Sequence, residues 1–206
     1  MVKAFAARSV AVSIAFFMHN LIAVAQENSK VPTWAVSPST AARLADQVDG
    51  DWFSIRPPKG FERAELGDTT AYDRAGIKIA AWTKEGDHSI APTITVMSMP
   101  ALETNGQSNR ELFQGFLNSL TAKWPNAKGS KISEGLWNGR RALRFQFSAT
   151  SEDDEHIRGV VLSDLSGPNT FYVSALSVGN TDEDAQELAA LTDSAISFKP
   201  KTSRTQ

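Results

Sequence analysis

Two of the chain's three histidines stand beside acidic residues, which makes them candidates for metal or acid–base chemistry. His88 follows Glu85 and Asp87, and His156 follows the acidic run 152–155. Imidazole and carboxylate groups are ordinary ligands of divalent cations, and an imidazole also serves as a general base. Neither cluster has the H-E-x-x-H spacing of a zinc site, or the glycine and final glutamate of a calcium loop. We therefore interpret both as solvated turns, and keep a small hydrolase or metal-dependent enzyme using His88 or His156 as the alternative.

Other catalytic signatures are missing from the sequence. It contains no cysteine, which excludes disulfides, thiolate metal sites and a cysteine nucleophile. It also contains no G-x-S-x-G elbow and no glycine-rich phosphate loop. A Ser-His-Asp triad stays open, because its members meet only in the folded chain. We predict no catalytic residue, no cofactor and no metal ligand.

Tryptophan side chains are frequent anchors in protein interfaces, and the chain has five of them. Trp52, Trp82 and Trp124 fall on predicted strands or a predicted helix, where we expect them in the core. Trp34 stands beside a loop and Trp137 beside a turn, and we predict that these two contact a partner. For Trp137, packing across its own hairpin is the alternative.

The first 25 residues have the pattern of a secretory signal peptide. Lys3 and Arg8 form a basic start, residues 10–18 are almost all apolar, and Ala23 and Ala25 are small residues at cleavage-site spacing. A permanent membrane helix needs about 20 apolar residues, so this run is too short to span a membrane. We expect cleavage after Ala25 and an exported product, periplasmic or secreted, without a stable membrane span. A retained anchor is the alternative.

Loss of this segment leaves a mildly acidic chain. The whole sequence has 21 basic and 23 acidic residues, and removing Lys3 and Arg8 leaves 19 basic residues and a net charge near −4. Nucleic acid or anionic lipid would require clustered Lys and Arg side chains. We therefore expect a protein partner and no nucleic acid, and the oligomeric state is left open. A mature chain of about 180 residues is long enough for a single core without disulfides.

The rest of the sequence divides into three parts. Residues 26–50 are a polar lead-in, in which residues 40–48 have the spacing of a short helix capped by Ser39. Residues 51–200 contain the predicted strands and two longer helices, and we expect a single α+β domain there. Residues 201–206 are expected to be a disordered tail.

Alternation of apolar and polar residues predicts a series of half-buried strands. They cover residues 52–55, 78–82, 92–99, 131–137, 141–150, 157–162 and 171–177. The link Asn138-Gly139 tolerates the positive φ angles of a type I′ turn and predicts a hairpin. Its second strand is expected to direct apolar residues to the core and polar residues to water, namely Leu143, Phe145 and Phe147 against Arg144, Gln146 and Ser148.

Two segments have a helical period instead. In residues 109–124 six apolar residues recur at intervals of three and four, namely Leu112, Phe113, Phe116, Leu117, Leu120 and Trp124. Ser108 and Glu111 stand before them at capping-box spacing. The second helix is expected over residues 182–196 after a Thr181 cap, with a buried stripe at Ala185, Leu188, Ala189 and Ile196.

The order of these elements is strands, helix, four strands, helix, without an internal repeat. This order is typical of an α+β fold in which helices cover the faces of a mainly antiparallel sheet. A doubly wound parallel sheet would instead alternate strands and helices.

Residues 53–61 read Phe-Ser-Ile-Arg-Pro-Pro-Lys-Gly-Phe. This segment resembles the opening F-x-I-x-x-P-x-G-W of the PsbP/Mog-like superfamily, with Phe61 in place of the usual Trp. The central helix, the hairpin with Ala142 just after its turn, and the closing run Ala-Ile-Ser-Phe at 195–198 follow in the same order. The resemblance covers residues 51–200 and implies an α/β/α sandwich around an antiparallel sheet.

Members of this superfamily have different roles. They include an extrinsic photosystem subunit, a Ran-binding import factor and DcrB-type bacterial envelope proteins, so the resemblance implies binding or stabilisation but no particular functional residue. We predict an exported, non-enzymatic protein of the bacterial envelope that binds or stabilises a partner. A carrier of a small ligand is a further alternative, which needs an apolar cavity between sheet and helix.

The signal peptide gives the first testable prediction. Intact-mass measurement and N-terminal sequencing of the exported product should give a chain that begins at Gln26. An exported product that still begins at Met1 would contradict it.

Overall fold

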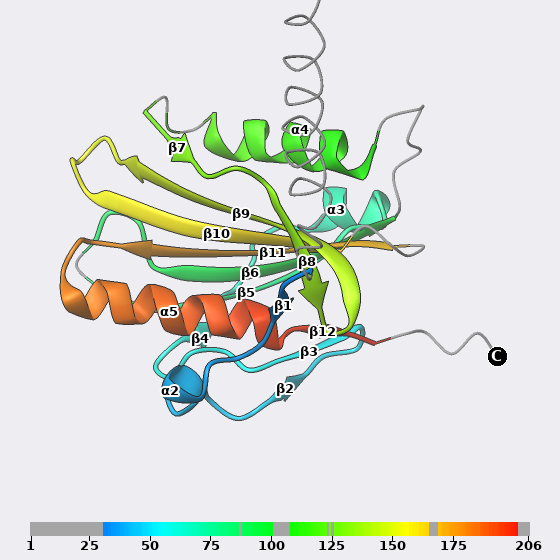
Figure 1. Cartoon of the computed structure of the whole chain (residues 1–206), viewed down its shortest axis with the longest axis horizontal. Coiled ribbons are helices and arrows are strands. Elements are labelled where there is room, and N and C mark those ends of the chain that lie inside the picture. Colours follow the sequence, from blue (N-terminus) through cyan, green and yellow to red (C-terminus); the bar gives the residue numbers. More distant parts are fainter. Residues whose placement is uncertain are drawn as a thin grey trace, which may run out of the picture. The chain divides into compact units, whose positions relative to one another are not determined.

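Long runs of alternating apolar and polar residues assemble into one large sheet (Figure 1). In the part of the chain that the structure describes, this sheet has nine strands in the order β1-β8-β9-β10-β11-β6-β5-β4, with β7 beside β9. The strands are β1 Thr33–Trp34, β4 Glu62–Arg63, β5 Lys78–Thr83, β6 Thr93–Pro100, β7 Lys128–Gly129, β8 Ser133–Trp137, β9 Arg140–Thr150, β10 His156–Asp164 and β11 Asn169–Val178. Among the strands that the structure describes in this sheet, only β1 and β8 pair in parallel.

The computed structural model describes residues 31–86, 88–100, 108–122, 124, 126–164 and 169–201. The predicted signal peptide and the tail beyond residue 201 lie outside the described residues. Within the described ranges, no helix is both long enough and apolar enough to cross a membrane.

The predicted hairpin joins β8 to β9. Asn138 and Gly139 have φ angles of 53° and 77°, and Trp137 pairs directly with Arg140. Two successive positive φ angles are the signature of a type I′ turn, whose twist matches that of the flanking strands. The hairpin prediction is therefore confirmed.

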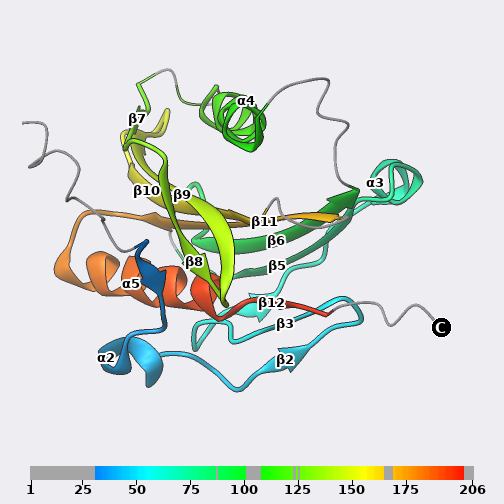
Figure 2. The same ribbon diagram turned by 45° about the vertical axis from the view of Figure 1, so that its right-hand side comes forward.

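Helices cover both faces of the large sheet (Figure 2). Helix α4, Asn109–Thr121, packs on one face and α5, Asp182–Ser197, on the other. The core under α4 consists of apolar residues that include Phe113, Leu117, Phe145, Phe147, Ile157 and Val161. The core on the α5 side includes Ile94, Val96, Val160, Leu162, Leu191 and Phe198. The α+β class, the mainly antiparallel sheet and its covering helices are confirmed.

Coverage of the second face changes the environment of its polar residues. Gln146 is exposed as expected, but Arg144 and Ser148 are half-buried, so the expectation that both face water is wrong. The alternation placed them correctly opposite the α4 core, but the sequence pattern of β9 does not reveal that α5 and the short helix α2, Pro38–Ala41, shield this second face. Of the three tryptophans expected in the core, Trp82 is buried. Trp52 is half-buried against the core on the α5 side, and Trp124 is half-buried against the core under α4.

Both long helices begin where their caps predict. Ser108 and Glu111 form a capping box at the start of α4, and Thr181 forms another with Asp184 at the start of α5. The prediction of a buried stripe on α5 is wrong for three of its four residues, and only Ile196 is buried. The buried positions are Ala190, Leu191, Asp193, Ser194, Ala195 and Ile196. Two of these are polar, and Asp193 is tolerated there because Ser37 and Thr40 donate hydrogen bonds to its carboxylate.

A second sheet of three strands lies beside the C-terminal end of α5 (Figures 1 and 2). Its strands are β2 Val48–Asp49, β3 Phe53–Ile55 and β12 Lys199–Pro200. Two short helices complete the described chain, namely α2 Pro38–Ala41 and α3 Thr70–Arg74.

The helix expected over residues 40–48 has different bounds. Pro38 begins α2, where its missing N–H is not needed. The helix ends at Ala41, and the chain after it pairs with a distant segment, because Ala45 N–H donates to the Pro57 carbonyl at 2.8 Å. Val48 then pairs with Ile55 in the small sheet.

Phe198 supplies a test of the core. It is fully buried, and its ring centroid lies 5.5 Å from Trp137, 5.8 Å from Phe171 and 6.1 Å from Phe53. Phe198→Ala should lower the free energy of unfolding by about 3–5 kcal/mol, because it removes a large buried ring and leaves a cavity. Urea unfolding followed by circular dichroism measures this value.

The matched control is Tyr72→Ala, since Tyr72 is 47% exposed. It should change stability by no more than about 0.5 kcal/mol. A loss below about 1 kcal/mol for Phe198→Ala would contradict the packing described here.

Candidate functional site: a charged groove on α5

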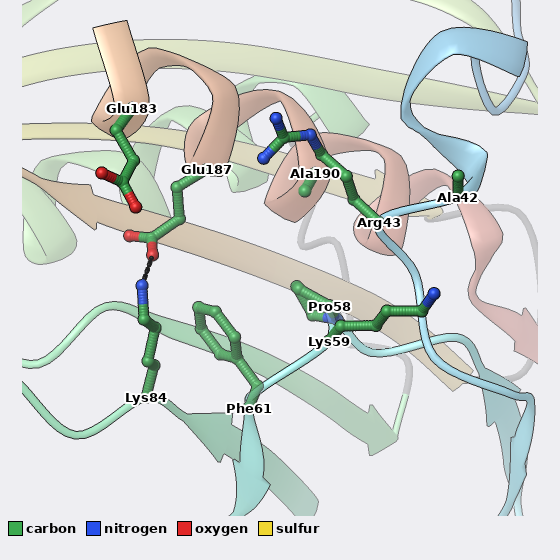
Figure 3. A pocket seen from close by; sticks show the side chains of 9 residues that line it. All are labelled: Ala42, Arg43, Pro58, Lys59, Phe61, Lys84, Glu183, Glu187 and Ala190. Carbon is green, nitrogen blue, oxygen red and sulfur yellow. Dashed lines mark hydrogen bonds and ion pairs between the residues drawn. The ribbon is translucent and has the colours of Figure 1, made fainter. Parts of the chain in front are cut away.

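A groove of about 240 Å³ opens along one side of α5 (Figure 3). We call it the α5 groove, and its lining residues are Ala42, Arg43, Pro58, Lys59, Phe61, Lys84, Glu183, Glu187 and Ala190. They come from α5, from the segment after α2, from the loop between β3 and β4, and from the end of β5. The groove therefore exists only once these distant segments have packed.

The loop between β3 and β4 provides the floor. Gly60 has a φ angle of 80°, and Phe61 N–H donates to the Pro58 carbonyl at 3.3 Å, so the chain reverses there. Lys59 N–H donates to the Arg43 carbonyl at 2.8 Å and ties this loop to the segment after α2. Figure 3 shows the Phe61 ring and Pro58 at the bottom of the groove.

The first turns of α5 provide an acidic wall. Thr181 and Asp184 satisfy each other in the capping box, which lowers the pKa of Asp184 mainly through its hydrogen bond from the Thr181 hydroxyl. Glu183 and Glu187, four residues apart, lie on one face of the helix and point toward the groove (Figure 3). The wall therefore carries two carboxylates that the cap does not use.

Lys84 faces this wall across the groove. Its Nζ lies 2.8 Å from Glu187 Oε2, and this hydrogen bond is the main cause of a raised pKa for Lys84. A lysine with a raised pKa is a fixed cation at neutral pH and a poor nucleophile. Arg43 donates to Gln186 of α5 and adds a second cation to the rim. The groove thus combines an apolar floor with walls of opposite charge.

Of the two predicted histidine clusters, His88 lies in the exposed segment between β5 and β6, and His156 is the first residue of β10. His88 lines a second hollow of about 230 Å³, which shares Lys84, Glu183 and Glu187 with the α5 groove. His156 is exposed and lines neither hollow. No group of three or more acidic or histidine side chains in the described ranges is arranged to hold a metal ion.

His88 does not activate a nucleophile in this arrangement. Its Nδ1 lies 3.0 Å from Glu155 Oε1, and the Ser89 hydroxyl donates to the other oxygen of the same carboxylate. In a serine triad the hydroxyl must bond to the imidazole, which in turn bonds to the acid. Here the serine and the imidazole share the acid, so the cluster orders a loop and lacks the relay from hydroxyl to base.

The structure brings together the two tryptophans predicted to contact a partner. Trp34 on β1 is the register partner of Trp137 on β8. Trp137 is buried, and its Nε1–H donates to the Ile196 carbonyl at 3.0 Å. Trp34 is half-buried, with its ring where a Cβ of Gly135 would otherwise lie. Neither lines the α5 groove, and partner contact stays a prediction for both.

The sequence interpretation did not identify the groove residues as a site. Its members stand between positions 42 and 190 and share no motif spacing. Two local signals were present. One was the pair Glu183 and Glu187 at helical spacing, and the other was Phe61 at the aromatic end of the segment that resembles a superfamily motif.

The Glu155 carboxylate gives a testable pKa. The hydrogen bond from Ser89 is the largest cause that lowers the pKa of Glu155 below its ordinary value of 4.5. Ser89→Ala should therefore raise the pKa of Glu155, as measured by NMR titration of its side-chain carboxyl carbon. Because the folded value is the lower one, the interaction stabilises the fold above pH 4.5 and is lost as the pH falls through the folded value.

Ser119→Ala on α4 is the control and should leave this titration unchanged, because its hydroxyl bonds to Gly115. An unchanged pKa for Glu155 in Ser89→Ala would show that the assigned hydrogen bond is wrong.

Comparison with known proteins shows the fold. No family model and no curated protein matches the chain. Cyanobacterial PsbP (CyanoP) from Synechocystis sp. PCC 6803 matches 82% of this chain and 98% of its own, with a TM-score of 0.51 and 10% identity. The Ran-binding protein Mog1p of Saccharomyces cerevisiae matches 75% of this chain and 94% of its own, with a TM-score of 0.50 and 13% identity.

A longer protein from Bacteroides thetaiotaomicron VPI-5482 also matches. The match covers 77% of this chain and 49% of the other, with a TM-score of 0.45 and 10% identity, so this chain spans about half of that protein's length. The likeness to CyanoP and Mog1p agrees with the sheet, the helices and their order described above. The chain has the PsbP/Mog-like fold.

Proposed function

We propose that the chain is an exported, non-enzymatic protein of the bacterial envelope that binds or stabilises a partner protein through the α5 groove. The observation that carries this proposal is the composition of the groove, in which Pro58 and Phe61 form an apolar floor between charged walls. An apolar centre with a polar, charged rim is the usual anatomy of a protein interface. Mog1p, which has this fold, is a Ran-binding protein, and this supports a binding role.

The charges of the groove define the partner's surface. The wall formed by Glu183 and Glu187 would face basic side chains of the partner, and Arg43 and Lys59 would face acidic ones. Such complementarity orients two proteins and speeds their association more than it adds affinity. An apolar or aromatic side chain of the partner would then lie on Phe61, which is half-buried and open to the groove.

The paired state of the ionisable groups favours binding over catalysis. The Lys84 ammonium is held by Glu187, and the His88 imidazole by Glu155. Among the residues that the structure describes, neither base is bonded to a hydroxyl that it could activate. These contacts fix charges in place, which suits recognition of a complementary surface.

Export and a second contact complete the proposal. The pattern of residues 1–25 supports secretion with cleavage after Ala25. Trp34, half-buried on the terminal strand β1, is proposed as a second partner contact. Trp137, its buried register partner, would support that strand from the core side.

Site-specific photo-crosslinking in the native host tests the groove. A crosslinking amino acid in place of Glu183 should give a discrete adduct with a single partner protein, because this position lines the groove. The same probe in place of Ala71, exposed on α3, is the matched control and should give no such adduct.

Phe61→Ala in the probe-bearing chain should reduce the adduct by about tenfold, since loss of an interface aromatic typically costs more than 1 kcal/mol. Equal adducts from both probe positions, or an adduct from position 183 that is unaffected by Phe61→Ala, would contradict the proposal.

A further inference from the structure

Arg144 stands at the centre of β9 on the sheet face that α5 covers. It alternates with Leu143 and Phe145, which point to the opposite core, and it pairs with Leu162 of β10. The guanidinium Nε is buried without a hydrogen-bond partner. Within the described residues no carboxylate forms an ion pair with it. Burial lowers the pKa of Arg144, and the nearby Asp193 opposes that effect only through space.

A half-buried cation with an unused donor is costly for the fold. Arginine presents five N–H donors in a planar fork, a geometry that fits a carboxylate through two parallel hydrogen bonds. An anion beside the guanidinium would therefore accept hydrogen bonds from its N–H groups and offset part of the cost of the half-buried charge.

A hollow of about 390 Å³ lies beside this guanidinium, between β9, α5 and the segment around α2. We call it the Arg144 pocket. Its polar lining includes Ser37, Ser39, Gln146 and Thr192. Ser37 and Ser39 hydroxyls share one hydrogen bond of 2.8 Å, so one of their two protons is left for a ligand. Neutral donors thus stand around the cationic one.

The opposite wall of the Arg144 pocket is apolar. Ala185, Leu188 and Ala189 line it, and they are three of the four α5 residues that the sequence pattern assigned to the core. Ala185 is exposed, and the other two are half-buried. Their exposed apolar surface, next to a guanidinium, fits a ligand with a charged head and a hydrocarbon body.

Asp193 limits the charge that the pocket accepts. Its carboxylate accepts the Ser37 N–H at 3.0 Å and the Thr40 hydroxyl, so it is already committed to holding α2. Its negative charge balances part of the field of Arg144 and would repel a dianion more than a monoanion. A single carboxylate therefore suits the pocket better than a phosphate.

Arg158 adds to the positive field on this face of the sheet. It pairs with Ser148 of β9, two residues along from Gln146. Its Nε and Nη2 are likewise buried without a hydrogen-bond partner. Two guanidiniums with unmatched donors thus lie on neighbouring strands under α5.

We propose that the Arg144 pocket binds a small monocarboxylate with a short hydrocarbon chain. The carboxylate would take two hydrogen bonds from the Arg144 guanidinium, and the chain would lie against Leu188 and Ala189. None of the residues that line this pocket lines the α5 groove, so the site is independent of the proposed protein partner.

Octanoate is the probe, titrated into the purified exported chain and followed by NMR. Saturable binding should shift the Arg144 Nε–H resonance and the amides of Leu188 and Ala189. Arg144→Gln should weaken binding by about tenfold or more, because it removes a charge-assisted bidentate contact. Arg141→Gln, exposed on the same strand and outside the pocket, is the matched control and should leave binding unchanged.

A second variant keeps the test decisive if Arg144→Gln does not fold. Ala185→Glu places a carboxylate at an exposed position of the pocket, where it would pair with Arg144 and displace octanoate without a core substitution. Octanamide, which has the same chain without the charge, should bind far more weakly.

Three results would overturn the proposal. These are no saturable octanoate binding at millimolar concentration, equal binding of octanamide, and undiminished binding by a folded Arg144→Gln or Ala185→Glu variant. Tighter binding of octyl phosphate than of octanoate would overturn the preference for a carboxylate.

Discussion

The packing of Phe198 at the end of α5 is the interaction on which the rest of the structure depends. Its ring meets aromatic side chains from both sheets, including Phe53 of the small sheet and Phe171 of the large one. Its carbonyl accepts the Asn138 side-chain amide, and the Ile196 carbonyl accepts Trp137 Nε1–H. The hairpin turn, the helix end and both sheets are therefore fixed at one point.

Helix α5 forms one wall of two separate sites, the α5 groove and the Arg144 pocket. Glu183, Glu187 and Ala190 recur at intervals of four and three and face the groove with the charged walls. Ala185 and Leu188 lie on a different stripe and face the pocket beside Arg144. One helix can line two sites of different composition because its stripes face different neighbours. The stripe with Glu183 and Glu187 faces the β3–β4 loop, and the stripe with Ala185 and Leu188 faces β9.

Local signals in the sequence predicted the elements well. These elements include the Asn138-Gly139 turn, the capping boxes at Ser108 and Thr181, and the alternating strands. Each depends on residues that are close in the chain, so the sequence pattern alone predicts it. Non-local effects were not predictable in the same way. Val48 is in a strand because Ile55 offers a partner for it, and Asp193 is buried because distant Ser37 satisfies it. Both sites combine residues far apart in the chain, and for this reason no motif search could find them.

Native-state hydrogen exchange of the Arg56 amide tests most directly whether α5 holds the two sheets together. This N–H donates to the Ser197 hydroxyl at 2.9 Å, so it reports the docking of the small sheet on the end of α5. If Phe198 fixes both sheets, the Arg56 amide should open with the same free energy as the amide of Val161, which is fully buried in β10. Opening of Arg56 at a much lower free energy, with Val161 still protected, would show that the small sheet separates on its own and would contradict this view of the fold.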